Sequence, residues 1–127
     1  IKPIDQVTAR FFRRLAYDMS FGGIATAGEE GERIAGAIGN HSSVMMQNHG
    51  VTTLGITVGE AWDALYHLER AARTMVLAYS TGKELAVMAD DLAEETAAEW
   101  QTYHDEAAAH FSEMKRVLDR EEPDYKD

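Results

Sequence analysis

The stretch that most constrains the fold is a β-hairpin signature at residues 43–55, which read SVMMQNHGVTTLG. Two short runs rich in apolar and β-branched residues, at 44–47 and 51–54, flank an Asn-His-Gly corner at 48–50. Glycine adopts positive φ angles without steric penalty, and asparagine tolerates the left-handed region better than most residues. The pattern therefore predicts two antiparallel strands joined by a tight turn, with His49 presented at a strand end.

The composition is that of a single ordinary domain. The chain has 127 residues, of which 45% are hydrophobic, and it contains no cysteine. The lack of cysteine excludes disulfides and a thiolate nucleophile, and it fits a cytoplasmic protein. No apolar run approaches the roughly 20 residues that span a bilayer, so no membrane is expected as a partner. The sequence begins with Ile1, and we expect the natural start to lie further upstream.

The net charge of −10 lies entirely in the last third of the chain. Residues 1–83 carry 8 acidic and 8 basic side chains, whereas residues 84–127 carry 14 acidic and 4 basic ones. An acidic surface repels a phosphate backbone, so nucleic acid is not an expected partner. We interpret the acidic tail as a solvated helix face, with an acidic contact face as the alternative.

Apolar spacing predicts two helices before the hairpin. The first follows Pro3, and the second begins at Gly28 and ends at Gly39, which can adopt a left-handed cap. Between them Gly22-Gly23 interrupts the pattern, and residues 24–25 are predicted as a short extended piece. The predicted buried stripe of the first helix is Ile4, Val7, Phe11 and Leu15. That of the second is Ile34, Ala35 and Ile38.

Two further helices are predicted after the hairpin. Thr57 and Glu60 form a capping-box signature that begins a helix running to about residue 80. A second start at Asp91 predicts one long helix to about residue 120, with Pro123 closing it. The predicted apolar face of the former is Ala61, Leu65, Leu68, Ala72, Met75, Val76 and Tyr79. That of the latter is Leu92, Thr96, Trp100, Tyr103, Ala107, Phe111, Met114 and Leu118.

The hairpin motif and the two segments that follow it resemble the class II aldolase/adducin family. These segments are Thr57-Val-Gly-Glu-Ala-Trp and Leu68-Glu-Arg-Ala-Ala. The resemblance implies an α/β fold, a three-layer α/β/α sandwich around a mostly antiparallel sheet. This chain would supply about four helices and the β-hairpin. The family's His-x-His lies upstream of the motif and does not occur here. Residues 1–127 would therefore be the carboxyl-terminal portion of one such domain.

The resemblance also implies a function. It makes His49 the third protein ligand of a divalent metal ion, with zinc as the first expectation and manganese, iron or cobalt as alternatives. The implied activity is that of a lyase, an aldolase or decarboxylase acting on a small hydroxy or oxo acid or a sugar phosphate through a metal-stabilised enolate. An adducin-like, non-enzymatic binding module is the alternative. The implied partners are a small-molecule substrate, the missing amino-terminal half of the domain, and further copies in a homotetramer.

No catalytic or cofactor-binding residue can be assigned, because the family's catalytic glutamate and other metal ligands lie upstream and no glycine-rich phosphate-binding signature is present. His41 is predicted to be a loop residue. His67 lies four residues after Asp63, which predicts an ordinary side-chain pair on one helix. His104 and His110 are six residues apart, on different helix faces, and neither they nor His67 is expected to bind metal.

Arginines at positions 10, 13 and 14 lie beside the first apolar stripe. A pair of guanidinium groups could bind a substrate phosphate. Surface charges on a helix are the commoner explanation, and we favour it.

Overall fold

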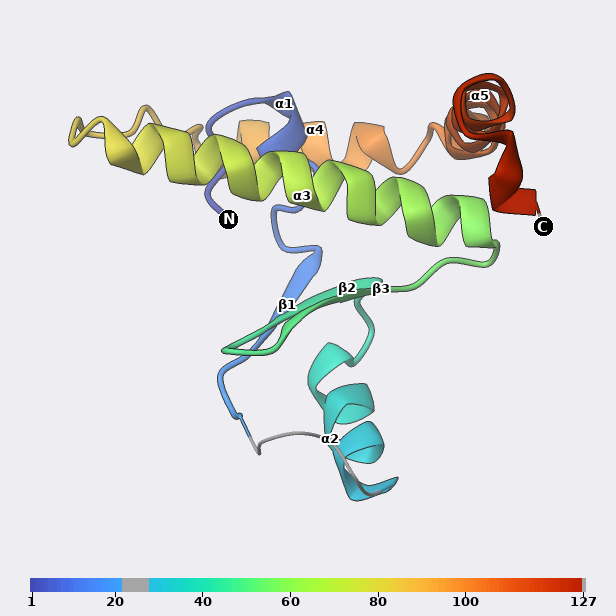
Figure 1. Ribbon diagram of the computed structural model, residues 1–127. Coiled ribbons are helices and arrows are strands. Elements are labelled where there is room, and N and C mark those ends of the chain that lie inside the picture. The colour runs from blue at the N-terminus through green and yellow to red at the C-terminus, as the bar shows by residue number, and fades with distance from the viewer. Residues whose placement is uncertain (22–27, 127) are drawn as a thin grey trace.

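A mixed three-stranded sheet lies between two layers of helices (Figure 1). The computed structural model describes residues 1–21 and 28–126, apart from the side chain of His104. The predicted extended piece at 24–25 lies outside these residues. The described elements are α1 (Gln6–Ala9), β1 (Leu15–Asp18), α2 (Gly28–Ile38), β2 (Ser43–Met46), β3 (Gly50–Thr53), α3 (Val58–Ser80), α4 (Asp90–Trp100), α5 (His104–Glu121) and a 3-10 turn (Pro123–Lys126). The architecture confirms the predicted α/β class. Within the described residues, no helix combines the length and the apolarity needed to cross a bilayer.

The predicted hairpin is present as the antiparallel pair β2–β3, in which Ser43 faces Thr53. The strand β1 was not predicted. It pairs in parallel with β2, with Leu15 opposite Ser43, and makes the sheet mixed. The interpretation of Leu15 as part of a helical stripe was wrong, because α1 is a single turn that ends at Ala9 and the chain passes through Arg13, at φ 54°, into the strand.

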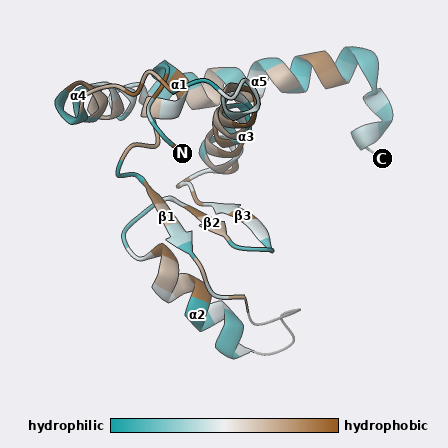
Figure 2. Ribbon diagram, turned by 90° about the vertical axis from the view of Figure 1, so that its left-hand side faces the viewer, coloured by the Kyte–Doolittle hydropathy of each residue, from teal (hydrophilic) through white to brown (hydrophobic). Residues whose placement is uncertain are grey.

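The two faces of the sheet bury separate hydrophobic clusters, because successive side chains of a strand point to opposite faces. One face packs against α3 and the other against α2. The cluster toward α3 contains Phe11, Leu15, Leu68 and Ala71, with Met45 packed against it. The cluster toward α2 contains Ala16, Ile38, Val44 and Met46, with Ile34 packed against it. Figure 2 shows hydrophobic residues on β1, β2 and the part of α2 nearest the sheet. Helices therefore cover the sheet on both sides, as the predicted sandwich requires.

The helix ends follow the local sequence signals. Gly39 has φ 53° and Gly82 has φ 67°, so both end their helices in the left-handed conformation. The Thr57 hydroxyl oxygen accepts a hydrogen bond from the Glu60 amide at 3.2 Å. The Glu60 carboxylate accepts one from the amide of Ile56 at 2.7 Å, one residue earlier than a standard capping box.

The predicted buried faces were correct only in part. Ala35 of α2 is exposed. On α3, the predicted residues Leu65, Val76 and Tyr79 are exposed, whereas the buried face is formed by Gly59, Asp63, Leu68, Ala71 and Met75. A polar residue thus takes a buried position on α3 that hydrophobic periodicity did not identify.

The single long carboxyl-terminal helix was also a wrong prediction. The chain leaves the helix at residues 101–103, which separate α4 from α5, and α4 begins after Ala89 without a side-chain cap. The break allows α5 to cross α3 (Figure 1). At the crossing the Phe111 ring packs over Gly59, where an added Cβ would lie 3.4 Å from the Phe111 Cβ. Tertiary packing on α3 therefore sets the direction of α5.

Candidate functional site

The β2–β3 turn presents His49 at the edge of the sheet. Asn48 has φ 56° and Gly50 has φ 145°, so both lie in the region that side chains other than glycine rarely adopt. The His49 amide donates a hydrogen bond to the Met46 carbonyl at 3.3 Å, which closes the turn. The imidazole is exposed, and its centroid lies 6.5 Å from that of the Phe21 ring, in an edge-to-face orientation. Local sequence thus places His49 as predicted.

An ion-pair network lies beside this turn, at the end of β1. Arg33 of α2 binds Glu30 through two nitrogens, at 2.6 and 2.7 Å, and also binds the buried carboxylate of Asp18. The Asp18 carboxylate accepts a further hydrogen bond from the Ser20 amide at 2.9 Å, and its backbone carbonyl accepts one from the Gln47 amide at 2.8 Å. The network ties the end of β1 to α2 and to the strand that leads into the turn.

The charges in this network stabilise one another. Hydrogen bonds from the Ser20 amide and from Arg33 lower the pKa of Asp18, and the hydrogen bond from Arg33 lowers the pKa of Glu30. The same contacts with Glu30 and Asp18 raise the pKa of Arg33. A positive charge on His49 would act in the same direction on both carboxylates. The surroundings of His49 are therefore anionic but already neutralised in part by one guanidinium.

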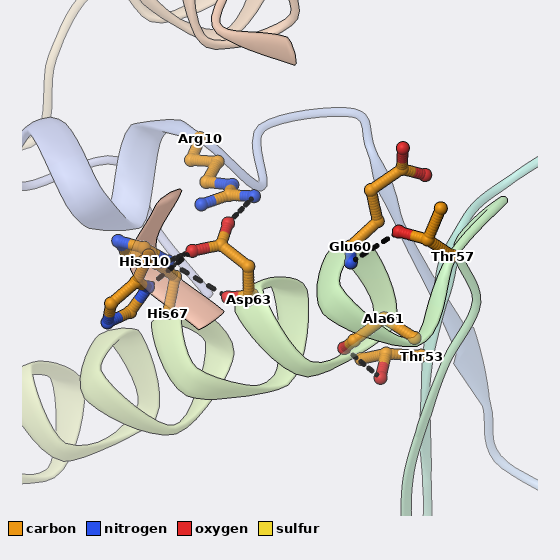
Figure 3. Close-up of polar contacts among 8 residues, drawn as sticks. All are labelled: Arg10, Thr53, Thr57, Glu60, Ala61, Asp63, His67 and His110. Carbon is orange, nitrogen blue, oxygen red and sulfur yellow. Dashed lines mark hydrogen bonds and ion pairs between the residues drawn. The ribbon is translucent and has the colours of Figure 1, made fainter. Parts of the chain in front are cut away.

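A second cluster of ionisable residues lies where α3, α5 and the end of α1 meet (Figure 3). At its centre is Asp63 of α3, whose carboxylate is buried and whose two oxygens have different hydrogen-bond partners. Its Oδ2 atom accepts a hydrogen bond from Arg10 at 2.8 Å. Its Oδ1 atom lies 2.7 Å from Nδ1 of His110 on α5 and 3.3 Å from Nδ1 of His67, one turn further along α3. One carboxylate therefore joins three segments of the chain.

Aromatic rings hold both imidazoles in place. The His110 ring lies 4.6 Å from the ring of Trp62 and 4.6 Å from that of Tyr66, measured between centroids. The His67 ring lies 5.5 Å from Trp100. A cavity of about 250 Å³ opens beside the cluster. It is lined by Arg10, Asp63, Tyr66, His67, Trp100, Tyr103, Glu106 and His110.

Burial and charge act against each other in this cluster. Burial disfavours ionisation of Asp63, but hydrogen bonds from His110 and Arg10 outweigh it, so the pKa of Asp63 is lowered. Burial lowers the pKa of His67, and the nearby Arg10 charge adds to this, against the opposing effect of Asp63. The folded chain therefore favours an ionised Asp63 beside a neutral His67.

The sequence predicted the pair of Asp63 and His67 but not its third member. His110 was interpreted as unrelated to them, because it belongs to another helix and the break before that helix had no glycine or proline signal. Among the described residues, the group of three that could hold a metal ion is Asp63, His67 and His110, and His49 is not in it. His41 is a loop residue as predicted, with Nδ1 3.1 Å from the Ile38 carbonyl oxygen.

The arginines pair with carboxylates, and the prediction of surface charges on a helix holds only in part: α1 ends at Ala9, and Arg13 is exposed whereas Arg10 is largely buried. Arg10 binds Asp63, Arg13 binds Asp90 at 2.9 Å, and Arg14 binds Glu94. These pairs connect the α1 region to α3 and α4.

Comparison with known proteins places residues 1–76 in the family described as Class II Aldolase and Adducin N-terminal domain. The chain is 34% identical over 93 residues to a putative aldolase class 2 protein of Caulobacter vibrioides, covering 73% of this chain and 36% of that protein. It is 29% identical over 92 residues to the decarboxylase NovR of Streptomyces niveus, covering 71% of this chain and 33% of that protein.

A solved structure has the same fold. The crystal structure of an aldolase II superfamily protein from Pseudomonas syringae superimposes with a TM-score of 0.89 at 30% sequence identity. The match covers 99% of this chain and 51% of that one. This chain therefore spans about a third of the length of the curated relatives it matches, and about half of the solved chain.

Proposed function

Because this chain belongs to the class II aldolase and adducin family, we propose that it is the carboxyl-terminal portion of the domain of a metal-dependent lyase. In this proposal His49 is one protein ligand of a divalent cation. The observation that carries it is the turn geometry: Asn48 and Gly50, on either side of His49, both have positive φ, and the turn holds an exposed imidazole at the sheet edge. A tight turn with Asn and Gly at these positions fixes the backbone around His49, and a metal ligand needs such a fixed position.

The residues around His49 fit such a cation in part. An imidazole nitrogen suits zinc, manganese, iron or cobalt, with zinc the first expectation. Two carboxylates near the turn, Asp18 and Glu30, are already bound by Arg33 and are not free to act as ligands. Within the described ranges no set of three ligating side chains includes His49. The remaining ligands would therefore come from the rest of the domain.

A bound divalent cation would supply Lewis-acid stabilisation of the negative charge that develops on a substrate oxygen. The chain's own contribution is positional. The left-handed turn fixes the imidazole, and the network of Asp18, Arg33 and Glu30 keeps the adjoining end of β1 in place. Held in this way, the ligand needs little reorganisation when the site is loaded.

The names of the relatives support a lyase and leave two reactions open. One relative is called a putative aldolase and another a decarboxylase. Aldol cleavage and loss of carbon dioxide both break a carbon–carbon bond and leave its electron pair on carbon next to a carbonyl group, so one electrophilic site serves both. A small hydroxy or oxo acid, or a sugar phosphate, has the required oxygens.

Exposed apolar residues support a partner for this chain. Leu54 and Ile56, between β3 and α3, and Val58, the first residue of α3, are at least half exposed, and Ile56 is 96% exposed. Contiguous exposed apolar surface marks interaction sites. We propose that the rest of the domain, or a further subunit of a homotetramer, covers this segment.

The experiment uses the complete protein and measures bound metal and lyase turnover for the wild type and for His49→Ala. We expect the substitution to remove one bound divalent ion per chain and to lower turnover by about 100-fold or more, because loss of even an outer-shell contact costs about 10–100-fold. The matched control is His41→Ala, which removes an exposed loop imidazole of the same chain.

Two results would reject the proposal. One is a His49→Ala protein that binds as many divalent ions per chain as the wild type and keeps its rate. The other is a complete protein without a bound divalent ion, which would favour the adducin-like binding module.

A further inference from the structure

We propose that Asp63, His67 and His110 form a second divalent-cation site, separate from His49, with zinc as the expected ion. The three side chains offer ligand atoms that all lie within 4.8 Å of one another. The group combines two imidazoles with one carboxylate. Zinc is commonly held by two imidazoles and a carboxylate with a fourth, open position.

The distances around Asp63 match those between ligands of a tetrahedral ion. With zinc–ligand bonds of about 2.0 Å, neighbouring ligand atoms of a tetrahedron lie about 3.3 Å apart. The Oδ1 atom of Asp63 lies 3.3 Å from Nδ1 of His67, the separation of two ligands of one ion; this nitrogen also donates a hydrogen bond to the Asp63 backbone carbonyl at 2.9 Å, which a cation would replace. It lies 2.7 Å from Nδ1 of His110, a hydrogen-bond distance that would open by a few tenths of an ångström when a cation replaces the shared proton.

The cluster is pre-organised for a cation. Trp62 and Tyr66 flank the His110 ring, and Trp100 lies beside the His67 ring, so neither imidazole is free to rotate away. Burial favours a neutral His67 and hydrogen bonding favours an ionised Asp63, which are the protonation states that ligate metals.

Arg10 occupies the opposite oxygen of the carboxylate and does not compete for the same lone pairs. It binds Oδ2, leaving Oδ1 to the two imidazoles. Ligating carboxylates are usually oriented by such an outer hydrogen bond. Its positive charge nevertheless opposes a nearby cation, which makes Arg10 a means of testing the site.

The open position would face the cavity beside the cluster. This space, about 250 Å³, is bordered by Tyr103 and Glu106 in addition to the ligands. It can admit a water molecule or a small ligand as the fourth donor. A cation there would also join α3 to α5 directly, since His110 is supplied by α5 and the other two ligands by α3.

The test measures cobalt(II) and zinc binding to the complete protein in a His49→Ala background, so that the cation proposed for the hairpin is removed from the count. Cobalt(II) reports low-coordinate nitrogen and oxygen ligation by its visible absorption. Trp62 fluorescence offers a second readout, because the Trp62 ring lies 4.6 Å from His110 and a paramagnetic ion would quench it.

We expect one cobalt ion per chain in the His49→Ala protein, displaced by zinc. Adding His67→Ala or His110→Ala should raise the dissociation constant by at least about 10-fold. Adding His41→Ala is the matched control and should leave the dissociation constant for cobalt unchanged. Far-ultraviolet circular dichroism of each variant establishes that it is folded.

A further substitution, Arg10→Gln, removes the opposing charge while keeping a hydrogen-bond donor, and it should tighten cobalt binding. This gain in affinity would not follow from loss of structure. The proposal is overturned if the His49→Ala protein binds no cobalt, or if its binding is unchanged by both His67→Ala and His110→Ala. Either outcome is separate from failure of the hairpin site, which is read from the comparison of wild type with His49→Ala.

Discussion

The Nδ1 atom of His110 lies 2.7 Å from the Oδ1 atom of Asp63, although 46 residues separate the two positions along the chain (Figure 3). This contact joins α5 to α3. Together with the bond from Arg10 to the other carboxylate oxygen, it makes Asp63 the point at which three parts of the chain are held together. Removing that carboxylate should therefore affect the stability of the whole α1, α3 and α5 layer.

The variant Asp63→Asn should lower the free energy of unfolding by about 2–3 kcal/mol. It leaves the largely buried guanidinium of Arg10 without its counter-charge, and breaking a buried ion pair from one side is costly. Urea denaturation of the complete protein measures the change. The matched control is Asp90→Asn, because Asp90 pairs with Arg13 at the surface, where both side chains are mostly exposed. The control should cost less than about 1 kcal/mol, and equal effects of the two substitutions would contradict the prediction.

The stability of the protein should fall as the pH is lowered from 7. The pKa of His67 is lowered by burial and by the Arg10 charge, so below about pH 6.5 the unfolded chain binds a proton that the folded chain does not. The pKa of Asp63 is lowered as well, so its contribution is present above about pH 4 and is lost as the pH falls through the folded value. Both groups act in the same direction.

The variant His67→Gln should flatten this dependence below about pH 6.5, because glutamine does not titrate. Thermal unfolding at a series of pH values provides the measurement. His41→Gln is the control, since His41 is an exposed loop residue. An unchanged slope in His67→Gln would show that other groups set the acid sensitivity.

Gly50→Ala should destabilise the protein by about 1–3 kcal/mol, because Gly50 has φ 145° and a side chain there is strained even though no atom obstructs it. The substitution Gly36→Ala should have the opposite effect on the free energy of unfolding. Gly36 lies within α2 with open space around it, and alanine there should stabilise by about 0.5–1 kcal/mol. Denaturant midpoints of the two variants test the pair, and a stabilised Gly50→Ala protein would refute the turn geometry.

The isolated 127-residue chain should self-associate or require the rest of the domain in order to remain monomeric. Val76, Leu77 and Tyr79, near the end of α3, are each more than half exposed. They are further exposed apolar residues besides those around Ile56. Sedimentation velocity over a range of concentrations measures association, and co-expression with the remainder of the domain should suppress it. A monomer at every concentration, with a sharp cooperative thermal transition, would contradict this prediction.

The sequence by itself determined the features that depend on near neighbours. The hairpin, the turn that presents His49 and the helix end at Gly39 all appear where they were predicted, and α3 ends at Ser80, in agreement with the predicted end at about residue 80. Turn conformation and helix capping are decided by residues within about four positions of each other. The family resemblance, carried by the same local motifs, was confirmed for the same reason.

Tertiary structure alone decided the features that need distant partners. Leu15 continues a helical stripe in sequence, but it becomes a strand residue because β2 offers it a hydrogen-bonding edge. The break at residues 101–103 carries no glycine or proline signal, and after it α5 packs with Phe111 over Gly59 of α3. The meeting of His110 with Asp63 and His67 depends on that break. Hydrophobic periodicity could not reveal the cluster, because it describes the faces of single helices and not the angle at which two of them cross.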